Sequence, residues 1–370
     1  MRIAQVAPLF ESVPPRFYGG TERIVSYLTD ELVQRGHDVT LFASGDSRTT
    51  ARLVPVVERA TRFDHDTHAV LSAAFIRELG MVFSRAADFD VIHCHLDYLA
   101  FPFHGLTPTP TVHTVHGRLD LAHLIPVYRQ FRTVPLVSIS DAQRVPLAPL
   151  GVRWAGTVYH GLPVERYAFA AEDRGYLAFL GRIAPEKQAD FAIEIARRVG
   201  LPLRIAAKVD AADQAYFERV VAPLLDDPLV EFLGEIGEDA KPAFLGGARA
   251  LLFPVDWPEP FGLVMIEALA CGTPVLARPR GSVPEIVRNG VTGFHCETVD
   301  DFVAALGRID VIDRAACRAD FEDRFTADVM AAQYERIFER ILTPIPATPL
   351  LPLDAAPPDP EPERSPAGSG

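Results

Sequence analysis

Short apolar runs alternate with helix-compatible segments along almost the whole chain. The runs RIAQVAP (2–8) and DVTLFA (38–43) are typical of buried strands, and the segment between them carries apolar residues at helical spacing before it reaches Gly36. Repetition of this alternation predicts parallel strands joined by helices, which is the doubly wound α/β class. A chain of 370 residues is too long for one typical core, so we expect two such domains in series.

Two series of predicted strands divide the chain. The first series is expected at 2–8, 38–43, 90–96, 110–117, 134–140 and 156–161, and the second at 176–183, 202–210, 230–236, 248–255, 274–279 and 292–297. Helices are expected between them, including 67–86, 185–200, 211–225 and 238–246, and the stretch 162–175 fits a linker. An amphipathic helix, 325–342, follows, and the proline-rich tail 343–370 should be disordered. Two such domains imply a ligand-binding cleft between them.

The stretch DWPEPFGLVMIEALACGTPVLA (256–277) opens a predicted helix whose first turn carries Phe261 and Gly262 without a basic side chain. Free backbone N–H groups there can hold an anion. Glu259 precedes this turn and Glu267 lies about two helical turns beyond it, and carboxylates accept hydrogen bonds from hydroxyl groups. The pattern favours a ligand with a central phosphate and a polyol on either side, such as a nucleotide sugar. The pair alone leaves open that Glu259 is a helix-start residue and Glu267 an exposed helix glutamate.

Other candidate residues follow predicted strands. Gly19 and Gly20 lie between a strand and a helix, where glycines let the backbone approach an oxyanion, although a plain flexible loop would have the same composition. Arg182 and Lys187 follow the strand 176–183, and their charges suit a diphosphate unless they are solvated surface residues. His116 ends the strand 110–117, and open α/β sheets bind ligands beyond the carboxyl ends of their strands. We therefore predict an active-site role for His116.

Composition argues against several other functions. The formal net charge of −13 argues against nucleic acid as the main partner and against a strongly cationic membrane-binding protein. No apolar stretch approaches the length of a transmembrane helix, and the first residues reach proline too early for a signal segment. The four cysteines form no C-x-x-C pair, which favours a reduced, cytoplasmic setting. His93 and His95 share a strand face, but no third residue is spaced to complete a metal site.

Taken together in this order, these segments resemble the family 4 (group 1) retaining glycosyltransferases of the GT-B fold over about residues 1–342. The resemblance includes the E-x7-E spacing of Glu259 and Glu267. The other matching motifs are YGGTERIVSYLTDELVQRGHDV near the start, VHG (115–117), SISDAQR (138–144), HGLPVERY (160–167), FLGRIAPEK (179–187), FLGEI (232–236), EPFGLVMIEALACGTPVLA (259–277) and GSVPEIVRNGVTGF (281–294).

The resemblance implies a GT-B architecture, in which two Rossmann-like domains face each other across a cleft. Residues 1–165 would form the acceptor-side domain and 166–324 the donor-binding domain. Residues 325–342 would be a crossover helix that packs back on the first domain, ahead of the tail 343–370.

The resemblance also implies a role for each matching residue. Gly19 and Gly20 would close over the donor phosphates. His116 would contact the transferred sugar, where it can orient a hydroxyl or stabilise charge. Arg182 and Lys187 would bind the diphosphate and stabilise the leaving group.

Further roles concern the donor. Glu259 would lie beside the donor sugar, and Glu267 would hold the ribose hydroxyls. Backbone groups would meet the phosphate at Phe261, Gly262 and Leu263. Residues 206–209 depart from the glycine-rich turn of many relatives, and Lys208 there is a candidate for an additional donor contact.

The implied activity is metal-independent transfer of a hexosyl group from an NDP-sugar to a hydroxyl of a sugar, lipid or small molecule, with retention of configuration and no cofactor. A UDP-hexose is the favoured donor and GDP-mannose the next. Alternatives are a nucleotide-sugar epimerase or a phosphorylase on the same plan, and a non-catalytic nucleotide-sugar-binding protein. The sequence leaves open the donor, the acceptor, the linkage, the oligomeric state, a partner for the tail and any peripheral membrane contact.

Overall fold

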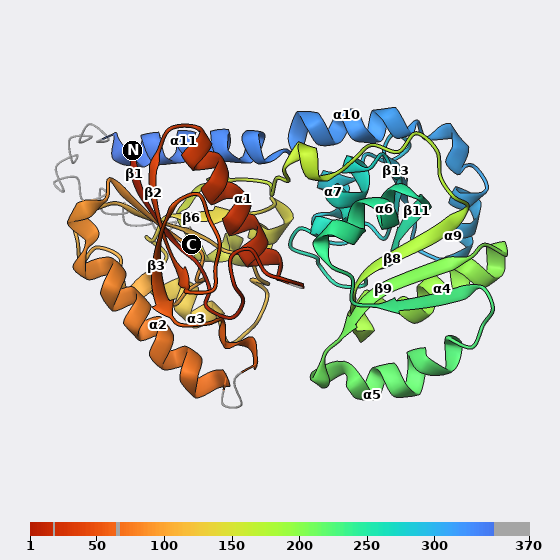
Figure 1. Ribbon diagram of the computed structural model, residues 1–370, viewed down its shortest axis with the longest axis horizontal. Helices are drawn as coiled ribbons and strands as arrows, with labels where there is room; N and C mark the ends of the chain where they lie inside the picture. The colour runs from red at the N-terminus through yellow and green to blue at the C-terminus, as the bar shows by residue number, and fades with distance from the viewer. Residues whose placement is uncertain (18, 64–66, 344–370) are drawn as a thin grey trace, which may run out of the picture.

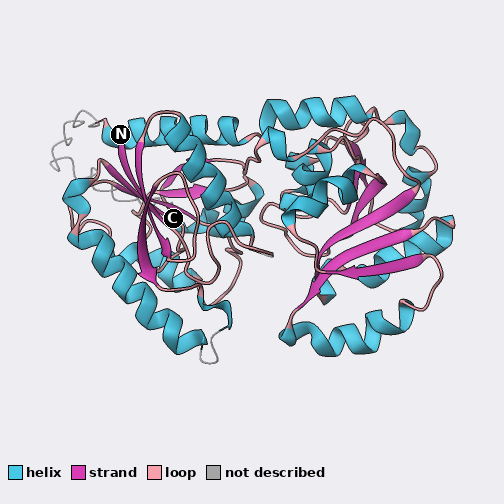
Figure 2. Cartoon of the chain, viewed as in Figure 1, coloured by secondary structure: helices cyan, strands magenta, loops and turns pink. Residues whose placement is uncertain are grey.

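The computed structural model describes residues 1–17, 19–63 and 67–343. Two parallel sheets form the centres of two domains (Figures 1 and 2). The strands of the first are β1 (Arg2–Val6), β2 (Asp38–Ser44), β3 (Arg52–Val57), β4 (Val91–Cys94), β5 (Thr111–Thr114), β6 (Leu136–Ser138) and β7 (Trp154–Thr157). They lie in the order β3-β2-β1-β4-β5-β6-β7. The predicted doubly wound α/β class is confirmed for this domain.

The second sheet has the order β10-β9-β8-β11-β12-β13. Its strands are β8 (Tyr176–Ile183), β9 (Leu203–Val209), β10 (Val230–Gly234), β11 (Ala248–Phe253), β12 (Val275–Ala277) and β13 (Gly293–His295). This is the strand order of a Rossmann domain, in which the direction of winding reverses between β8 and β11. Ligands of such sheets bind at the carboxyl ends of the two strands that flank the reversal. The residues after β8 and β11 are therefore in the position where a ligand is expected.

Helices connect the strands in both domains. The α-helices are α1 (Gly20–Gln34), α2 (Thr67–Ser84), α3 (Ile125–Gln130), α4 (Ala189–Val199), α5 (Gln214–Tyr216), α6 (Lys241–Gly246), α7 (Leu263–Ala270), α8 (Val283–Ile286), α9 (Val299–Leu306), α10 (Arg314–Arg324) and α11 (Ala327–Leu342). Helix α1 buries the apolar positions on which its prediction rested, because Ile24, Val25, Leu28 and Leu32 have no exposed surface.

Helix α11 returns to the first domain after the second sheet is complete and runs beside α1 (Figure 1). Arg35, which follows α1, forms ion pairs with Asp328 at 2.6 Å and with Glu335 at 2.7 Å. On the inner face of α11, the buried ring of Tyr334 lies 4.8 Å from that of His93. Burial of the apolar stripe of α11 therefore ties the end of the second domain to the first.

Three predictions about secondary structure were wrong in part. No strand was expected between 43 and 90, but this stretch contains the edge strand β3, whose central Pro55 has no N–H group and so obscured the strand pattern. The expected helix 211–225 is broken into 3₁₀ and π turns around α5. The strand expected at 156–161 is instead β7, which ends at Thr157, and Leu162 then pairs with Thr326 between α10 and α11.

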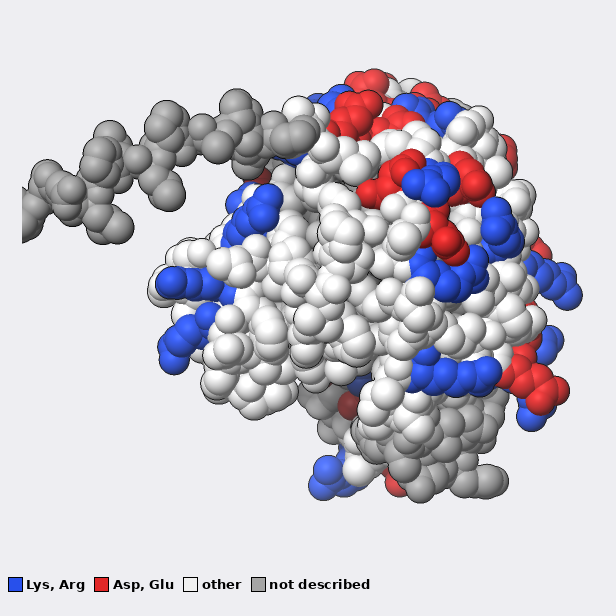
Figure 3. All heavy atoms as spheres, turned by 90° about the vertical axis from the view of Figure 1, so that its left-hand side faces the viewer, with Lys and Arg blue, Asp and Glu red and all other residues white. Residues whose placement is uncertain are grey.

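Figure 3 looks at the end of the molecule that is on the left in Figure 1. Acidic and basic side chains mix at the upper right of this face, and basic side chains alone lie along its left edge. The visible described surface therefore has no continuous basic area of the kind that binds nucleic acid. The predicted tail lies outside the described residues, except for Thr343.

Candidate functional site

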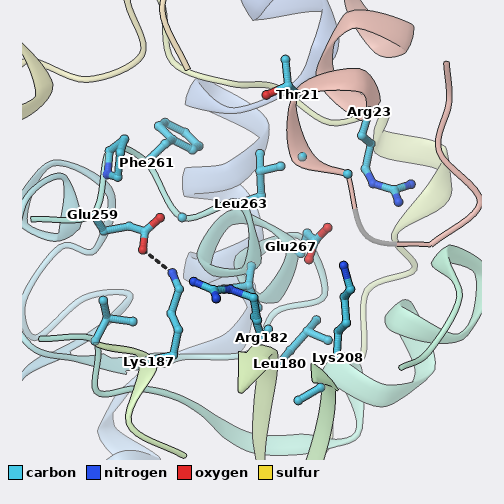
Figure 4. Close-up of a pocket in the computed structure, with 18 of the residues that line it drawn as sticks. Thr21, Arg23, Leu180, Arg182, Lys187, Lys208, Glu259, Phe261, Leu263 and Glu267 are labelled. Carbon is cyan, nitrogen blue, oxygen red and sulfur yellow. Dashed lines mark hydrogen bonds and ion pairs between the residues drawn. The ribbon is translucent and has the colours of Figure 1, made fainter. Parts of the chain in front are cut away.

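A cavity of about 720 Å³ lies between the two domains. The start of α1 and the loop after β5 line it on one side, and the ends of β8, β9 and β11 and the start of α7 line it on the other (Figure 4). Every residue predicted for the site contributes to this lining: Gly19, Gly20, His116, Arg182, Lys187, Lys208, Glu259, Phe261, Gly262, Leu263 and Glu267. The fold thus brings them together, and their individual roles stay predictions.

Gly262 sets the start of α7. Its φ of 81° is in the left-handed region, and a Cβ atom there would lie 2.7 Å from Cε of Met265. Only glycine meets both conditions without strain. The helix begins at Leu263, so the N–H groups of Leu263 and Val264 have no acceptor within the helix, whereas Met265 already donates to the Gly262 carbonyl at 3.0 Å. Because this end of the helix lines the cavity, those groups can serve an anion there.

Glu259 is held by two donors. Its Oε2 atom forms an ion pair with Nζ of Lys187 and accepts a hydrogen bond of 2.7 Å from Nε1 of Trp257. The Lys187 ammonium group also lies 5.0 Å from the centre of the Trp257 ring. Both ion-paired side chains are mostly buried, at 15% exposure for Lys187 and 11% for Glu259. A cation and a carboxylate are thus fixed next to each other beside the start of α7 (Figure 4).

Arg182 has different partners from Lys187, although the two were predicted to act as a pair. Its guanidinium group forms ion pairs with Glu186 at 2.6 Å and with Asp213, and lies 3.9 Å from Asp210. Arg182, Lys187 and Lys208 enter the cavity from the same side in Figure 4. A diphosphate that recruits Arg182 would therefore compete with carboxylates for its donors.

Glu267 is buried at 2% exposure and forms an ion pair of 2.8 Å with Lys241, at the start of α6. The same ammonium group lies 3.0 Å from Oε2 of Glu238. Tyr167 donates a hydrogen bond of 2.6 Å to Oε1 of Glu238 and lies 3.3 Å from Glu267. Lys241 therefore forms ion pairs with both carboxylates in this corner of the cavity.

Arg23 connects this corner to the first domain. It comes from the first turns of α1 and forms an ion pair of 2.7 Å with Glu238, and Tyr27 of the same helix donates to Glu238 at 3.2 Å. Burial favours a higher pKa for Glu238, but the charges of Lys241 and Arg23 outweigh it and hold the pKa below its ordinary value. The charged Glu238 carboxylate therefore forms ion pairs with side chains of both domains.

His116 follows β5 and lies at the opposite side of the cavity from the lysines. Burial lowers its pKa to about 3, so its ring is neutral at pH 7. Its backbone N–H donates a hydrogen bond of 3.0 Å to Asp97, and its ring stacks on that of His160 at 5.3 Å. Of the two roles implied above, a neutral ring supports orientation of a hydroxyl and does not support stabilisation by positive charge.

Several of these residues were missed by the sequence reasoning. They are Arg23, Tyr27, Tyr167, Trp257, Glu238 and Lys241. Two signals were available, because Lys241 is one of only three lysines and Tyr167 ends the motif HGLPVERY. The ion pair between Arg23 and Glu238 spans more than half of the chain and had no local signature.

Comparison with known families decides the identity of this cavity. The family described as "Glycosyl transferases group 1" matches residues 166–318, and the family described as "Glycosyltransferase Family 4" matches residues 18–155. Together the two matches include every residue predicted for the site. The chain is a family 4, group 1 glycosyltransferase.

Individual relatives agree with this assignment. The chain is 27% identical to a glycogen synthase of Mycobacterium tuberculosis, over 82% of this chain and 84% of that protein. It is 26% identical to a phosphatidyl-myo-inositol mannosyltransferase of the same species, over 92% and 97% of the two chains. The crystal structure of a glycosyltransferase involved in avilamycin A biosynthesis is 25% identical and superposes with a TM-score of 0.69, over 92% and 98%. The predicted GT-B architecture of this glycosyltransferase is confirmed.

None of the helices that the structure describes has the length and apolar character needed to cross a membrane. Among the described residues, no group of three or more His, Cys, Asp or Glu side chains is placed to hold a metal ion. His93 and His95 therefore have no third ligand of these types among those residues.

Proposed function

We propose that this glycosyltransferase moves a hexosyl group from an NDP-sugar to an acceptor hydroxyl in the interdomain cavity, with retention of configuration. The observation that carries the proposal is the ion pair between Lys187 and Glu259 just before the start of α7, with Glu267 about one turn inside that helix. A diphosphate at the helix start would have a carboxylate on either side, one for the sugar and one for the ribose.

The leaving group is the nucleoside diphosphate, whose charge increases as its bond to the sugar breaks. Lys187 and the first N–H groups of α7 would lie where that charge develops, and fixed donors of this kind are usually the largest single source of catalysis. We propose that these groups make a metal unnecessary and that no cofactor takes part. Lys208 and Arg182 line the same cavity and would add donors for the phosphates.

In the proposed step, the bond between the anomeric carbon and the phosphate oxygen breaks and a bond from the acceptor oxygen forms on the same face. The acceptor proton passes to the departing phosphate. His116, which is neutral, and Glu259 would orient hydroxyls of the transferred sugar. The products are the glycosylated acceptor and the nucleoside diphosphate.

A UDP-hexose is the proposed donor and GDP-mannose the next candidate, since the similar proteins include a mannosyltransferase by name. The acceptor would be a hydroxyl of a sugar, a lipid or a small molecule, and a lipid would bring peripheral membrane contact. We place the reaction in the cytoplasm, because Cys94, Cys271, Cys296 and Cys317 are all free and buried, as in a reducing compartment.

The test is product analysis by ¹H NMR with UDP-, GDP- and ADP-hexoses, a panel of hydroxyl acceptors and excess EDTA. We expect one donor to give a product with the anomeric configuration of the donor. Lys187→Ala should reduce turnover by at least about a hundredfold, a loss typical for one oxyanion-stabilising group. Arg249→Ala, which removes an arginine bound to Asp310 in the same domain, is the matched control and should keep turnover. Inversion of configuration, or full activity of Lys187→Ala, would refute the mechanism.

A further inference from the structure

The ring of His116 belongs to a chain of three side chains that leads from the cavity into the first sheet. Nε2 of His116 lies 2.9 Å from Nδ1 of His95, and Nε2 of His95 lies 2.8 Å from Oε1 of Gln5. Gln5 is on β1 and His95 directly follows the adjacent strand β4. Gln5 is fully buried and His95 is 2% exposed, so water does not replace these contacts.

The direction of the hydrogen bonds in this chain follows from simple valence. A neutral imidazole has one N–H group, so one ring nitrogen donates and the other accepts. His95 and His116 are both neutral, because burial lowers their pKa values far below 7. The carbonyl oxygen of Gln5 only accepts, so His95 must donate from Nε2 and accept at Nδ1. His116 must then donate from Nε2.

This leaves Nδ1 of His116 as an acceptor without a proton. That atom is buried and has no hydrogen-bond partner among the described residues, and His116 is one of the residues that line the cavity. An unpaired buried acceptor is unfavourable until a donor reaches it, and the transferred sugar would bring hydroxyl donors.

We propose that Gln5 and His95 are positioning residues that fix His116 in its Nε2–H tautomer, so that Nδ1 accepts a hydrogen bond from a hydroxyl of the transferred sugar. The inference rests on the proposed function. If the Gln5 amide were turned round, its NH₂ group would donate to His95 and every proton in the chain would move. His116 would then present an N–H group to the sugar. The orientation of the Gln5 amide therefore determines whether His116 presents a hydrogen-bond acceptor or an N–H donor to the sugar.

The first experiment is ¹⁵N NMR of the full chain with labelled histidine rings, because protonated and unprotonated ring nitrogens resonate far apart. We expect His116 to be protonated at Nε2 in the wild type. Gln5→Leu removes the acceptor and should mix the two tautomers. A His116 ring protonated at Nδ1 in the wild type, or unchanged in Gln5→Leu, would overturn the proposal. The wild-type result decides even if a variant does not fold.

A matched control is His113→Phe, which removes another buried histidine of β5 whose ring nitrogens both lack partners among the described residues. It should leave the His116 tautomer unchanged. With the donor identified, Gln5→Leu should lower kcat about tenfold, as expected for a second layer of support around a reactive group, and should leave the KM for the donor within twofold. Equal kcat values in Gln5→Leu and the wild type would refute the positioning role.

Ligand titration separates this inference from the proposed function. We expect the Nδ1 resonance of His116 to move when the nucleotide sugar is added and to stay when the nucleotide alone is added. No movement with a nucleotide sugar that binds would overturn the sugar contact. If no nucleotide or nucleotide sugar binds the wild type at all, the proposed function fails and the sugar contact fails with it, while the tautomer assignment is decided by the unliganded spectrum.

Discussion

Arg23→Met should weaken nucleotide binding although Arg23 lies on the first domain. Arg23 and Glu238 pair at 2.7 Å with side chains only 5% and 12% exposed. Removing one partner of a buried ion pair costs about 3 to 5 kcal/mol, and the lower value applies here because Lys241 remains 3.0 Å from Glu238. Lys241 would then serve Glu238 and Glu267 without help from the first domain.

If the domains move apart, water reaches the Glu238 carboxylate and this cost is avoided. The loss of Arg23 therefore favours an open arrangement of the domains over the closed one. Because a ligand binds only the competent fraction of the molecules, a cost of about 3 kcal/mol would weaken the affinity by at most roughly a hundredfold. We expect a loss of between about tenfold and a hundredfold, measured by isothermal titration calorimetry with the nucleotide that the wild type binds. Small-angle scattering should show a larger radius of gyration for Arg23→Met.

The double variant Arg23→Met with Glu238→Gln provides the sharper comparison. Without the carboxylate there is no buried charge to compensate, so the double variant should recover most of the affinity lost by Arg23→Met. The reasoning is refuted if Arg23→Met binds as tightly as the wild type, or if the double variant is as weak as the single one.

Three further predictions concern other parts of the molecule. Gly262→Ala should lower the free energy of unfolding by about 1 to 3 kcal/mol and abolish nucleotide binding. The reason is that the φ of 81° strains any residue with a Cβ atom, and the Met265 side chain occupies the space that this atom needs. An unchanged chemical denaturation curve would contradict this prediction. Trp257→Phe removes the 2.7 Å hydrogen bond to Glu259 and should lower kcat by about tenfold at constant nucleotide affinity, which steady-state kinetics and calorimetry would check. Glu78 is buried without a partner in the described chain, and burial raises its pKa well above the ordinary value. The free energy of unfolding therefore falls as the pH rises from about 4.5 to the raised pKa of the folded state. Glu78→Gln should increase the melting temperature at pH 8 more than at pH 5. Equal increases at the two pH values would refute this prediction.

Local pattern was enough to predict much of the fold and to select residues that the fold gathers around one cavity. The strand 176–183 was predicted with the bounds of β8, and Lys187 and Glu259 were assigned from their place after strands and at a helix start. These are properties of short segments, in which strand ends and helix starts bring the functional groups to one edge of a sheet.

What sequence reasoning missed depends on contacts between distant segments. The ion pair between Arg23 and Glu238 and the chain from Gln5 through His95 to His116 join residues that have no shared local pattern. Gln5 in particular sits inside an apolar strand, where a polar residue has no visible purpose until the neighbouring strand is in place. Tertiary pairing of polar groups, and not periodicity, determines these parts of the site.

The most direct test of the central claim is a thermal-shift measurement with UDP, GDP, ADP and their common sugars, without metal and then with magnesium. A ligand of the folded state raises the midpoint according to the ratio of its concentration to its Kd. We predict that one nucleotide raises the midpoint without metal, and that Lys187→Ala abolishes the increase while Arg249→Ala retains it. An unchanged midpoint with every nucleotide and sugar would show that the interdomain cavity is not a nucleotide-sugar site.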